Sequence, residues 1–168
     1  RISRNIGEFA MSIAVQPRPL GPDRADVKCA IPASAFLGEG PHWSVADKKL
    51  YFVDILAPAA CIGDPATGTY TSLPVPELIG FIVPRRRGGV VAGMHGEIRG
   101  LDLKSGETTT IAKPEADRPG NRFNDGKCDR AGRLWAGTLA IDTAPDQGRL
   151  WRIDTDGKAV EMDRGFHV

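Results

Sequence analysis

A repeated pattern of short strands constrains the fold of this 168-residue chain more than any other feature. Each repeat contains a turn, an apolar strand, a short connection, a second strand, and an Asp that leads into a glycine turn. The pattern occurs three times, in residues 48–70, 88–108 and 132–158. Leu50, Val90 and Leu134 open equivalent strands at intervals of about 40 to 45 residues, which is the typical length of a β-propeller blade.

The residue types within the repeats favour strands over helices. The apolar runs are rich in Val, Ile, Phe, Tyr and Trp, which suit strands. No stretch places apolar residues at helical spacing over three turns, and the polar segment "SVADKK" at 44–49 predicts a hairpin turn. We therefore predict an all-β fold in which the chain covers about three blades of a β-propeller.

The chain is expected to contain one domain after a short leader. Residues 1–10 lack the apolar core of a secretory signal, and Met11 offers a natural start, so we expect these ten residues to be a leader. Residues 11–168 are then the N-terminal half of a single propeller domain. Three blades do not close a ring of about four to eight, so the open faces predict self-association.

Composition excludes several classes of function. The net charge of +1 gives no reason to expect nucleic acid, and Arg85–Arg87 is interpreted as a solvated turn. No apolar stretch approaches the roughly 18 to 20 residues that span a membrane. The three cysteines, Cys29, Cys61 and Cys128, lack CxxC spacing, which favours a reducing cytoplasm over disulfides or structural zinc. Cys128 is expected in the core.

The first candidate site is the sequence "FLGEGPHW" at 36–43. Glu39 lies between two glycines, which permit a tight turn and the close approach of other groups. A carboxylate in this setting suits a hard metal such as calcium or magnesium, and it also accepts zinc. The alternative is a turn glutamate that faces water.

The second candidate site is the polar block at 121–127, just before a predicted strand. Arg122 presents a fork of donors to hydroxyl or carboxylate oxygens, and Asn124 offers both a donor and an acceptor to a sugar hydroxyl or a metal. Asp125 and the following glycine also fit a plain polar β-turn. Asp142 lies in a loop inserted at 139–149 and is otherwise an exposed acidic residue.

Motifs for other chemistries are absent. His42, His95 and His167 share no metal-binding spacing, and His42 beside Trp43 is interpreted as structural. The sequence contains no GxSxG elbow of a serine esterase. It also contains no P-loop and no GxGxxG after a strand.

Two motifs resemble those of the SMP-30/gluconolactonase/regucalcin family. They are "GEGPHW" followed by "LYFVDI", and the specific block "NRFNDGKCDRAGRLWAGT" at 121–138. The resemblance extends from about Phe36 to Val168. It implies a six-bladed β-propeller with one divalent metal on its central axis, of which this chain is the N-terminal half.

The resemblance also implies roles for the candidate residues. Glu39 corresponds to a metal ligand, and Arg122 and Asn124 correspond to a substrate-binding pair. Asp125 matches an acid that supports the site without touching the metal. Asp142 lies where the family often has a glutamate that contacts sugar hydroxyls, and the shorter side chain departs from that pattern. The family's other metal ligands are an Asn in an "SNGLAWS"-like motif and a later Asp that shuttles protons. Both are missing, so the general base is expected beyond residue 168.

The implied activity is metal-dependent hydrolysis of a sugar lactone, of the gluconolactone or pentonolactone type, to the aldonic acid. The expected cofactor is one divalent ion (Ca, Zn, Mn or Mg), and the expected partner is the small-molecule lactone. Because the chain holds only part of the site, we expect little activity from it alone. The alternatives are a non-catalytic metal-binding or regulatory propeller, and a propeller hydrolase of phosphotriesters or other esters.

Overall fold

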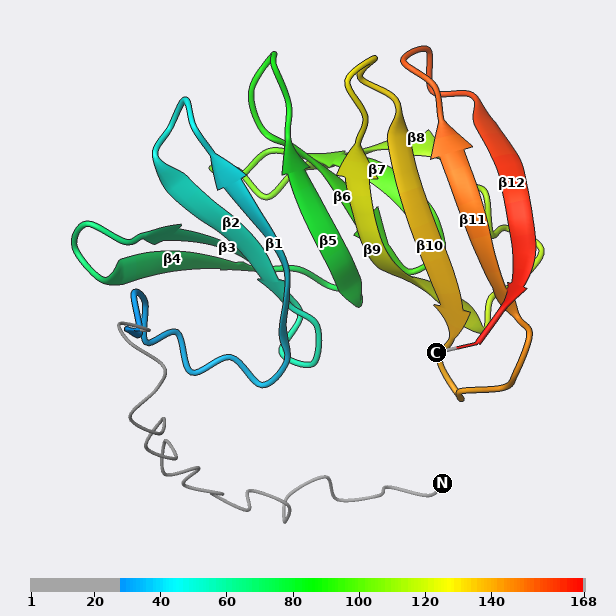
Figure 1. The fold of residues 1–168 in the computed structure, drawn as a ribbon, viewed down its shortest axis with the longest axis horizontal. Helices are drawn as coiled ribbons and strands as arrows, with labels where there is room; N and C mark the ends of the chain where they lie inside the picture. Colours follow the sequence, from blue (N-terminus) through cyan, green and yellow to red (C-terminus); the bar gives the residue numbers. More distant parts are fainter. Residues whose placement is uncertain (1–27, 168) are drawn as a thin grey trace, which may run out of the picture.

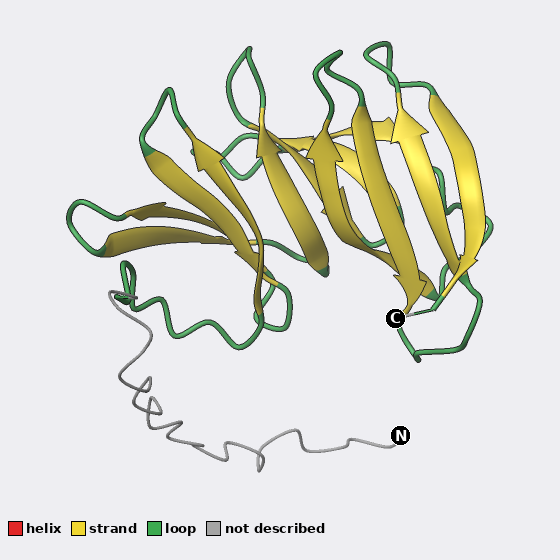
Figure 2. Cartoon of the chain, in the orientation of Figure 1, coloured by secondary structure: helices red, strands yellow, loops and turns green. Residues whose placement is uncertain are grey.

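The structure, a computed structural model, describes residues 28–167, whose regular elements are all β-strands (Figure 2). Twelve strands form three four-stranded antiparallel sheets, each from four strands consecutive in the chain. The prediction of an all-β fold with about three blades is therefore confirmed. The predicted leader, residues 1–10, lies outside the described residues. Within the described part of the chain, no helix is long and apolar enough to cross a membrane.

Within each blade the strands form a meander, in which each strand pairs with the next. The first blade contains β1 (Gly38–Ser44), β2 (Lys49–Asp54), β3 (Ala59–Asp64) and β4 (Thr69–Pro74). The second contains β5 (Ile79–Pro84), β6 (Val90–Met94), β7 (Glu97–Leu101) and β8 (Thr108–Ala112). The third contains β9 (Asn121–Cys128), β10 (Leu134–Ala140), β11 (Gly148–Ile153) and β12 (Ala159–Phe166).

The first strand of each blade lies innermost, where the blades meet. β1, β5 and β9 run in the same direction, so their N-terminal ends lie at one end of the molecule, the lower end in Figure 1. β5 packs against both β1 and β9, and β1 also contacts β9. The blades thus fan out from a shared line of inner strands, as propeller blades do about their axis.

Two apolar cores between adjacent blades hold the blades together. The core between the first and second blades consists of Val53, Ile55, Ala60, Ile79, Ile82, Val90, Ala92, Met94 and Leu101. The core between the second and third blades consists of Phe81, Val83, Ile98, Phe123, Leu134, Ala136, Trp151 and Ile153. β5 contributes to both, so the second blade is buried on both faces. The outer faces of the first and third blades meet no further blade within residues 28–167, and self-association stays a prediction.

Each inner strand carries a β-bulge near its N-terminal end. The pairing register shifts after Glu39 in β1, at Gly80 in β5 and at Asn124–Asp125 in β9, where two residues face Gly137 alone. A bulge adds one unpaired residue, bends the strand and re-aims its side chains, and bulges often lie beside functional sites. The three bulges therefore mark one level along the inner strands.

A similar turn follows the third strand of every blade, with the glycine four residues after the Asp in the first two blades and three residues after it in the third. In each case the backbone oxygen of the Asp accepts a hydrogen bond from the N–H of a following glycine. The pairs are Asp64 with Gly68 at 2.8 Å, Asp102 with Gly106 at 2.9 Å, and Asp154 with Gly157 at 2.9 Å.

Two smaller predictions have different outcomes. Arg85–Arg87 forms an exposed turn between β5 and β6, as predicted. The prediction that Cys128 lies in the core is wrong, because Cys128 is the last residue of β9 and is exposed. The inner strand continues for two residues past Gly126, its last buried position, so its end lies beyond the core.

The packing of β5 on β9 requires a residue without a side chain at Gly80. A Cβ atom there would overlap the backbone oxygen of Phe123 and lie 2.8 Å from the backbone oxygen of Asn124. Backbone atoms cannot rotate aside as the end of a flexible side chain can. A side chain at this position would therefore push the second and third blades apart.

Replacing Gly80 with Ala is expected to lower the free energy of unfolding by about 2–3 kcal/mol, measured by urea denaturation. Gly137→Ala in β10 is the matched control, because a Cβ there meets no atom within 4 Å. We expect this control to change stability by no more than about 0.5 kcal/mol. Equal losses in the two variants would contradict the packing argument.

Candidate active site

The candidate residues lie where the inner strands begin. Glu39 is the second residue of β1, and Arg122 is the second residue of β9. Because β1 and β9 run in the same direction on either side of β5, both residues lie at the lower end of the molecule in Figure 1. Two motifs far apart in the sequence thus meet at one end of the propeller axis.

Glu39 presents an available carboxylate at this end. The residue is exposed and precedes the bulge of β1, where Gly40 adopts a left-handed conformation with φ of 59°. Its one hydrogen bond within the described residues is long, 3.4 Å from the N–H of Gly40 to Oε2. The oxygens of Glu39 are therefore free to accept other donors or to bind a cation.

Asp54 fixes the backbone that leads to Glu39. Its carboxylate is buried at the end of β2 and accepts the N–H of Phe36 at 2.8 Å and of Leu37 at 3.1 Å. It also accepts the N–H groups of Leu56 and Ala57, at 3.2 and 3.1 Å. Burial by itself raises the pKa of a carboxyl, but these four backbone donors outweigh burial and hold the pKa of Asp54 below its usual value.

Arg122 is half-buried and holds its neighbour Asn124 in place. Its Nη1 donates to the backbone oxygen of Phe123 at 2.9 Å and to Oδ1 of Asn124 at 3.4 Å. Burial lowers the pKa of Arg122, and the negative charge of Glu39 opposes that shift. The guanidinium remains cationic, and the negative charge that opposes the shift comes from a different blade.

Asn124 and Asp125 form the bulge of β9. Asn124 is half-buried and is held by Arg122, whereas Asp125 is exposed. The carboxylate of Asp125 accepts the N–H of Gly126 at 2.8 Å and the ammonium of Lys127 at 2.8 Å. Asp125 therefore stiffens the bulge, and its supporting role at the site stays a prediction.

Asp142 lies at the same end of the third blade but apart from Glu39 and Arg122. It is exposed in the loop between β10 and β11, where its Oδ1 accepts the N–H of Ala144 at 3.1 Å. It lines a cleft of about 330 Å³ together with Arg118, Gly120, Asn121, Ala140, Ala144 and Gln147. Among the described residues its side chain contacts neither of the other two candidates.

His42 lies further along β1 than Glu39, and its interpretation as a structural residue stays a prediction. It is half-buried in β1, beyond the bulge that follows Glu39. Burial lowers the pKa of His42, and the positive charge of Lys127 on β9 lowers it further. The lysine lies in the third blade and the histidine in the first, so a charge on one blade affects the pKa of a group on another.

The described residues fit part of a metal site. Within residues 28–167 no group of three or more His, Cys, Asp or Glu side chains could hold a metal ion. Among the candidates on the inner strands, Glu39 offers a carboxylate whose single hydrogen bond is long. The donor set fits one ligand of a divalent cation and requires further ligands from elsewhere.

Known proteins resemble this chain over the region that contains both motifs. The family model described as "SMP-30/Gluconolactonase/LRE-like region" matches residues 37–168. Regucalcin of Xenopus laevis is 34% identical over 140 residues, which cover 80% of this chain and 47% of the regucalcin. A 6-deoxy-6-sulfogluconolactonase of Pseudomonas putida is 35% identical over 136 residues, covering 81% and 47%.

A solved structure is similar over the same region. It is a calcium-binding protein, regucalcin, from Agrobacterium tumefaciens str. C58, with 25% identity and a TM-score of 0.73. The match covers 79% of this chain and 44% of that one. This chain thus spans about half the length of the curated relatives it matches.

The support from Asp54 has a pH dependence of defined sign. Because the folded-state pKa of Asp54 is lowered, its contribution is complete above the ordinary value of about 4 and is lost as the pH falls through the folded value. We expect Asp54→Asn to lower the free energy of unfolding by about 1–3 kcal/mol at pH 7. The difference from the unmodified chain should shrink at pH 3, as measured by urea unfolding. A difference that stays constant with pH would contradict this role of the carboxylate.

Proposed function

Because this chain belongs to the SMP-30/gluconolactonase/LRE-like family, we propose that it forms part of a metal-dependent hydrolase of sugar lactones. The proposed reaction adds water to the carbonyl of a gluconolactone or pentonolactone and yields the aldonic acid. The relative named as a sulfogluconolactonase supports the lactone as substrate class. A cytoplasmic location stays a prediction from the cysteines.

One observation carries the proposal. Glu39 and Arg122, from motifs far apart in the chain, lie near the starts of two inner strands that contact each other, β1 and β9, and the negative charge of Glu39 opposes the lowering of the pKa of Arg122 by burial. A carboxylate for a cation beside a guanidinium for substrate oxygens is a combination suited to a neutral, oxygen-rich ester. A polar turn at the surface does not require a half-buried arginine whose guanidinium donates to the backbone oxygen of the next residue.

The metal would be held by Glu39 and by ligands that the described residues do not supply. We propose Ca²⁺, Zn²⁺, Mn²⁺ or Mg²⁺, and the calcium-binding relative supports a divalent ion. When bound, such an ion polarises the lactone carbonyl and stabilises negative charge that develops on its oxygen. The general base is also proposed to come from outside this chain.

The residues of this chain would bind and orient the sugar. Arg122 donates to ring or carbonyl oxygens, and Asn124, held through its Oδ1, presents its amide N–H groups to a hydroxyl. Asp142 accepts hydrogen bonds from hydroxyl groups further along the sugar. Fixing the substrate in this way lowers the entropic part of the barrier.

The coding sequence downstream of residue 168 supplies the first test. We expect an Asn motif of the "SNGL" type and a later Asp there, and a protein extended through them should hydrolyse glucono-1,5-lactone when a divalent ion is added. The 168-residue chain, with one proposed ligand, should stay near the uncatalysed rate in the same assay. Metal binding by the extended protein without lactone turnover would contradict the proposal and favour a non-catalytic propeller.

Glu39→Gln in the extended protein tests the metal ligand. We expect metal affinity to fall by more than about 100-fold, because even supporting residues around a metal contribute about 10- to 100-fold. Titration calorimetry with Ca²⁺ and Zn²⁺ measures this loss. Glu107→Gln, an exposed glutamate in the turn between β7 and β8, is the matched control and should bind metal normally. Normal binding by Glu39→Gln would remove Glu39 from the site.

Arg122→Lys in the extended protein tests substrate binding. Lysine keeps the charge but loses the fork of donors, so we expect KM for glucono-1,5-lactone to rise by about 10-fold or more with unchanged metal affinity. Lys104→Arg, in an exposed turn, controls for an exchange of basic side chains. A changed metal affinity with unchanged KM would assign Arg122 to the metal instead.

A further inference from the structure

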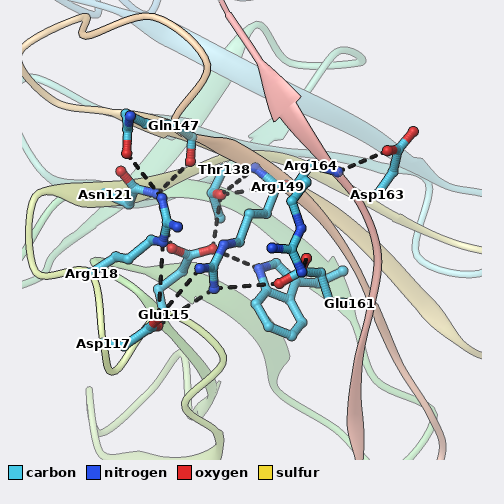
Figure 3. A network of polar contacts seen from close by, with 11 residues as sticks. Glu115, Asp117, Arg118, Asn121, Thr138, Gln147, Arg149, Glu161, Asp163 and Arg164 are labelled. Carbon is cyan, nitrogen blue, oxygen red and sulfur yellow. Dashed lines mark hydrogen bonds and ion pairs between the residues drawn. The ribbon is translucent and has the colours of Figure 1, made fainter.

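A buried carboxylate links the strands of the third blade to the loop that precedes them. Glu115 lies in the connection between β8 and β9 and is 2% exposed. Its oxygens accept hydrogen bonds from Asn121 Nδ2 at 2.9 Å, Thr138 Oγ1 at 3.0 Å and Trp151 Nε1 at 2.6 Å (Figure 3). These donors come from β9, β10 and β11, so one side chain joins three strands.

The chemistry of the donors suits an ionised carboxylate. The indole of Trp151 can only donate, and so can the amide nitrogen of Asn121. Thr138 Oγ1 accepts the backbone N–H of Arg149 at 3.0 Å, which leaves its own hydrogen for Glu115. Glu115 therefore acts as an acceptor in all three contacts.

Arg149 packs on the indole that donates to Glu115, and its own charge is paired with two other carboxylates. The guanidinium lies 5.7 Å from the centre of the Trp151 ring and pairs with Asp117 at 3.3 Å and Glu161 at 3.5 Å. An isolated buried charge is costly, whereas one that is hydrogen-bonded and close to an opposite charge is tolerated. Glu115 meets the first condition through its three hydrogen bonds.

The contacts continue from Asn121 into the insertion loop, residues 141–147. The same Nδ2 of Asn121 also donates to the backbone oxygen of Gln147 at 3.0 Å. Arg118 Nη1 donates to Gln147 Oε1 at 2.9 Å, and the N–H of Ile141 donates to the oxygen of Gly120 at 2.9 Å. Both ends of the insertion loop are thus attached to the connection that holds Glu115.

We propose that Glu115 is a positioning residue for the substrate-binding side chains of the third blade. Asn121, which it holds, directly precedes Arg122, and the loop attached through Asn121 carries Asp142. One buried carboxylate thereby sets the distance between the two groups that grip the sugar. This inference rests on the proposed function, because it concerns the orientation of the same substrate.

Glu115→Gln breaks one arm of the network and keeps the others. Oxygen Oε1 receives Thr138 and Trp151 and is retained in the amide. The new NH₂ group replaces Oε2 and faces the NH₂ of Asn121, donor against donor. If Asn121 turns its amide over, its oxygen then faces the oxygen of Gln147. Either arrangement weakens the attachment of the insertion loop through Asn121, while the contacts of Arg118 and Gly120 to that loop and the core of the blade remain.

Hydrogen–deuterium exchange on the 168-residue chain and lactone kinetics on the extended protein test the proposal together. We expect Glu115→Gln to speed exchange in 141–147 by about 10-fold. In the extended protein KM should rise several-fold while kcat and metal affinity change little. Arg118→Ala, which removes a partly exposed contact to the same loop, should give a smaller change in the same direction. Arg118→Ala serves as the second variant if Glu115→Gln does not fold.

Asp129→Asn is the matched control. Asp129 lies in the turn at the opposite end of β9, where it also accepts an indole N–H, from Trp135 at 3.1 Å, and pairs with Arg133. Its loss should lower stability without changing exchange in 141–147 or KM. Equal effects of the two variants on KM would mean that Glu115 acts through stability alone and would overturn the proposal.

The outcomes separate this inference from the proposed function. If the extended protein hydrolyses lactones and Glu115→Gln leaves exchange and KM unchanged, only the inference fails. If the extended protein does not hydrolyse lactones, the proposed function fails, and positioning of a sugar by Glu115 fails with it. Faster exchange in the variant would then show a structural link alone.

Discussion

The approach of β5 to β9, backbone against backbone at Gly80, is the constraint on which the remaining structure depends. It sets the spacing of the second and third blades, so the apolar side chains on either side of β5 can fill both inter-blade cores. It also brings the start of β9, with Arg122, to the level where β1 presents Glu39. A wider separation would leave voids in the cores and would part the two charged groups.

The bulges convert this close packing into a site. Without its bulge, β5 would direct Ile79 and Phe81 to the same face, yet these side chains lie in different cores. In β9 the bulge places Asn124 and Asp125 opposite a single residue, which turns Asn124 toward Arg122. Regular strands pack blades together, and it is the irregular positions that point polar groups toward the axis.

Much of the fold was predictable from the sequence because the repeat is local. The strands around Leu50, Val90 and Leu134, and the Asp turns after them, follow from patterns within a few residues. The extent of the site was less accessible, because it depends on contacts between blades. The charge of Lys127 in the third blade lowers the pKa of His42 in the first, and a periodic sequence pattern cannot predict an effect between residues so far apart in the chain.

Glu115 shows the same limit in a different way. In the sequence it is one acidic residue in a polar loop after a proline, and such residues are usually exposed. Its burial follows from Trp151, whose indole N–H donates to it, and from Thr138 and Asn121, which donate to the same carboxylate. Cys128 is the converse, since an apolar-looking strand end lies outside the core. In both cases the exposure of the side chain depends on how the blade packs in three dimensions, which the local sequence does not show.

Since β1, β5 and β9 begin at one end of the axis, each blade places the first residues of its inner strand at the same end from an independent module. The lengths of the loops at that end are not coupled to the short turns at the other, so one loop can be rebuilt without shifting the register of any sheet. The insertion between β10 and β11 is such a case. In this architecture a loop that contacts substrate can therefore change in length while the strands that support it keep their pairing.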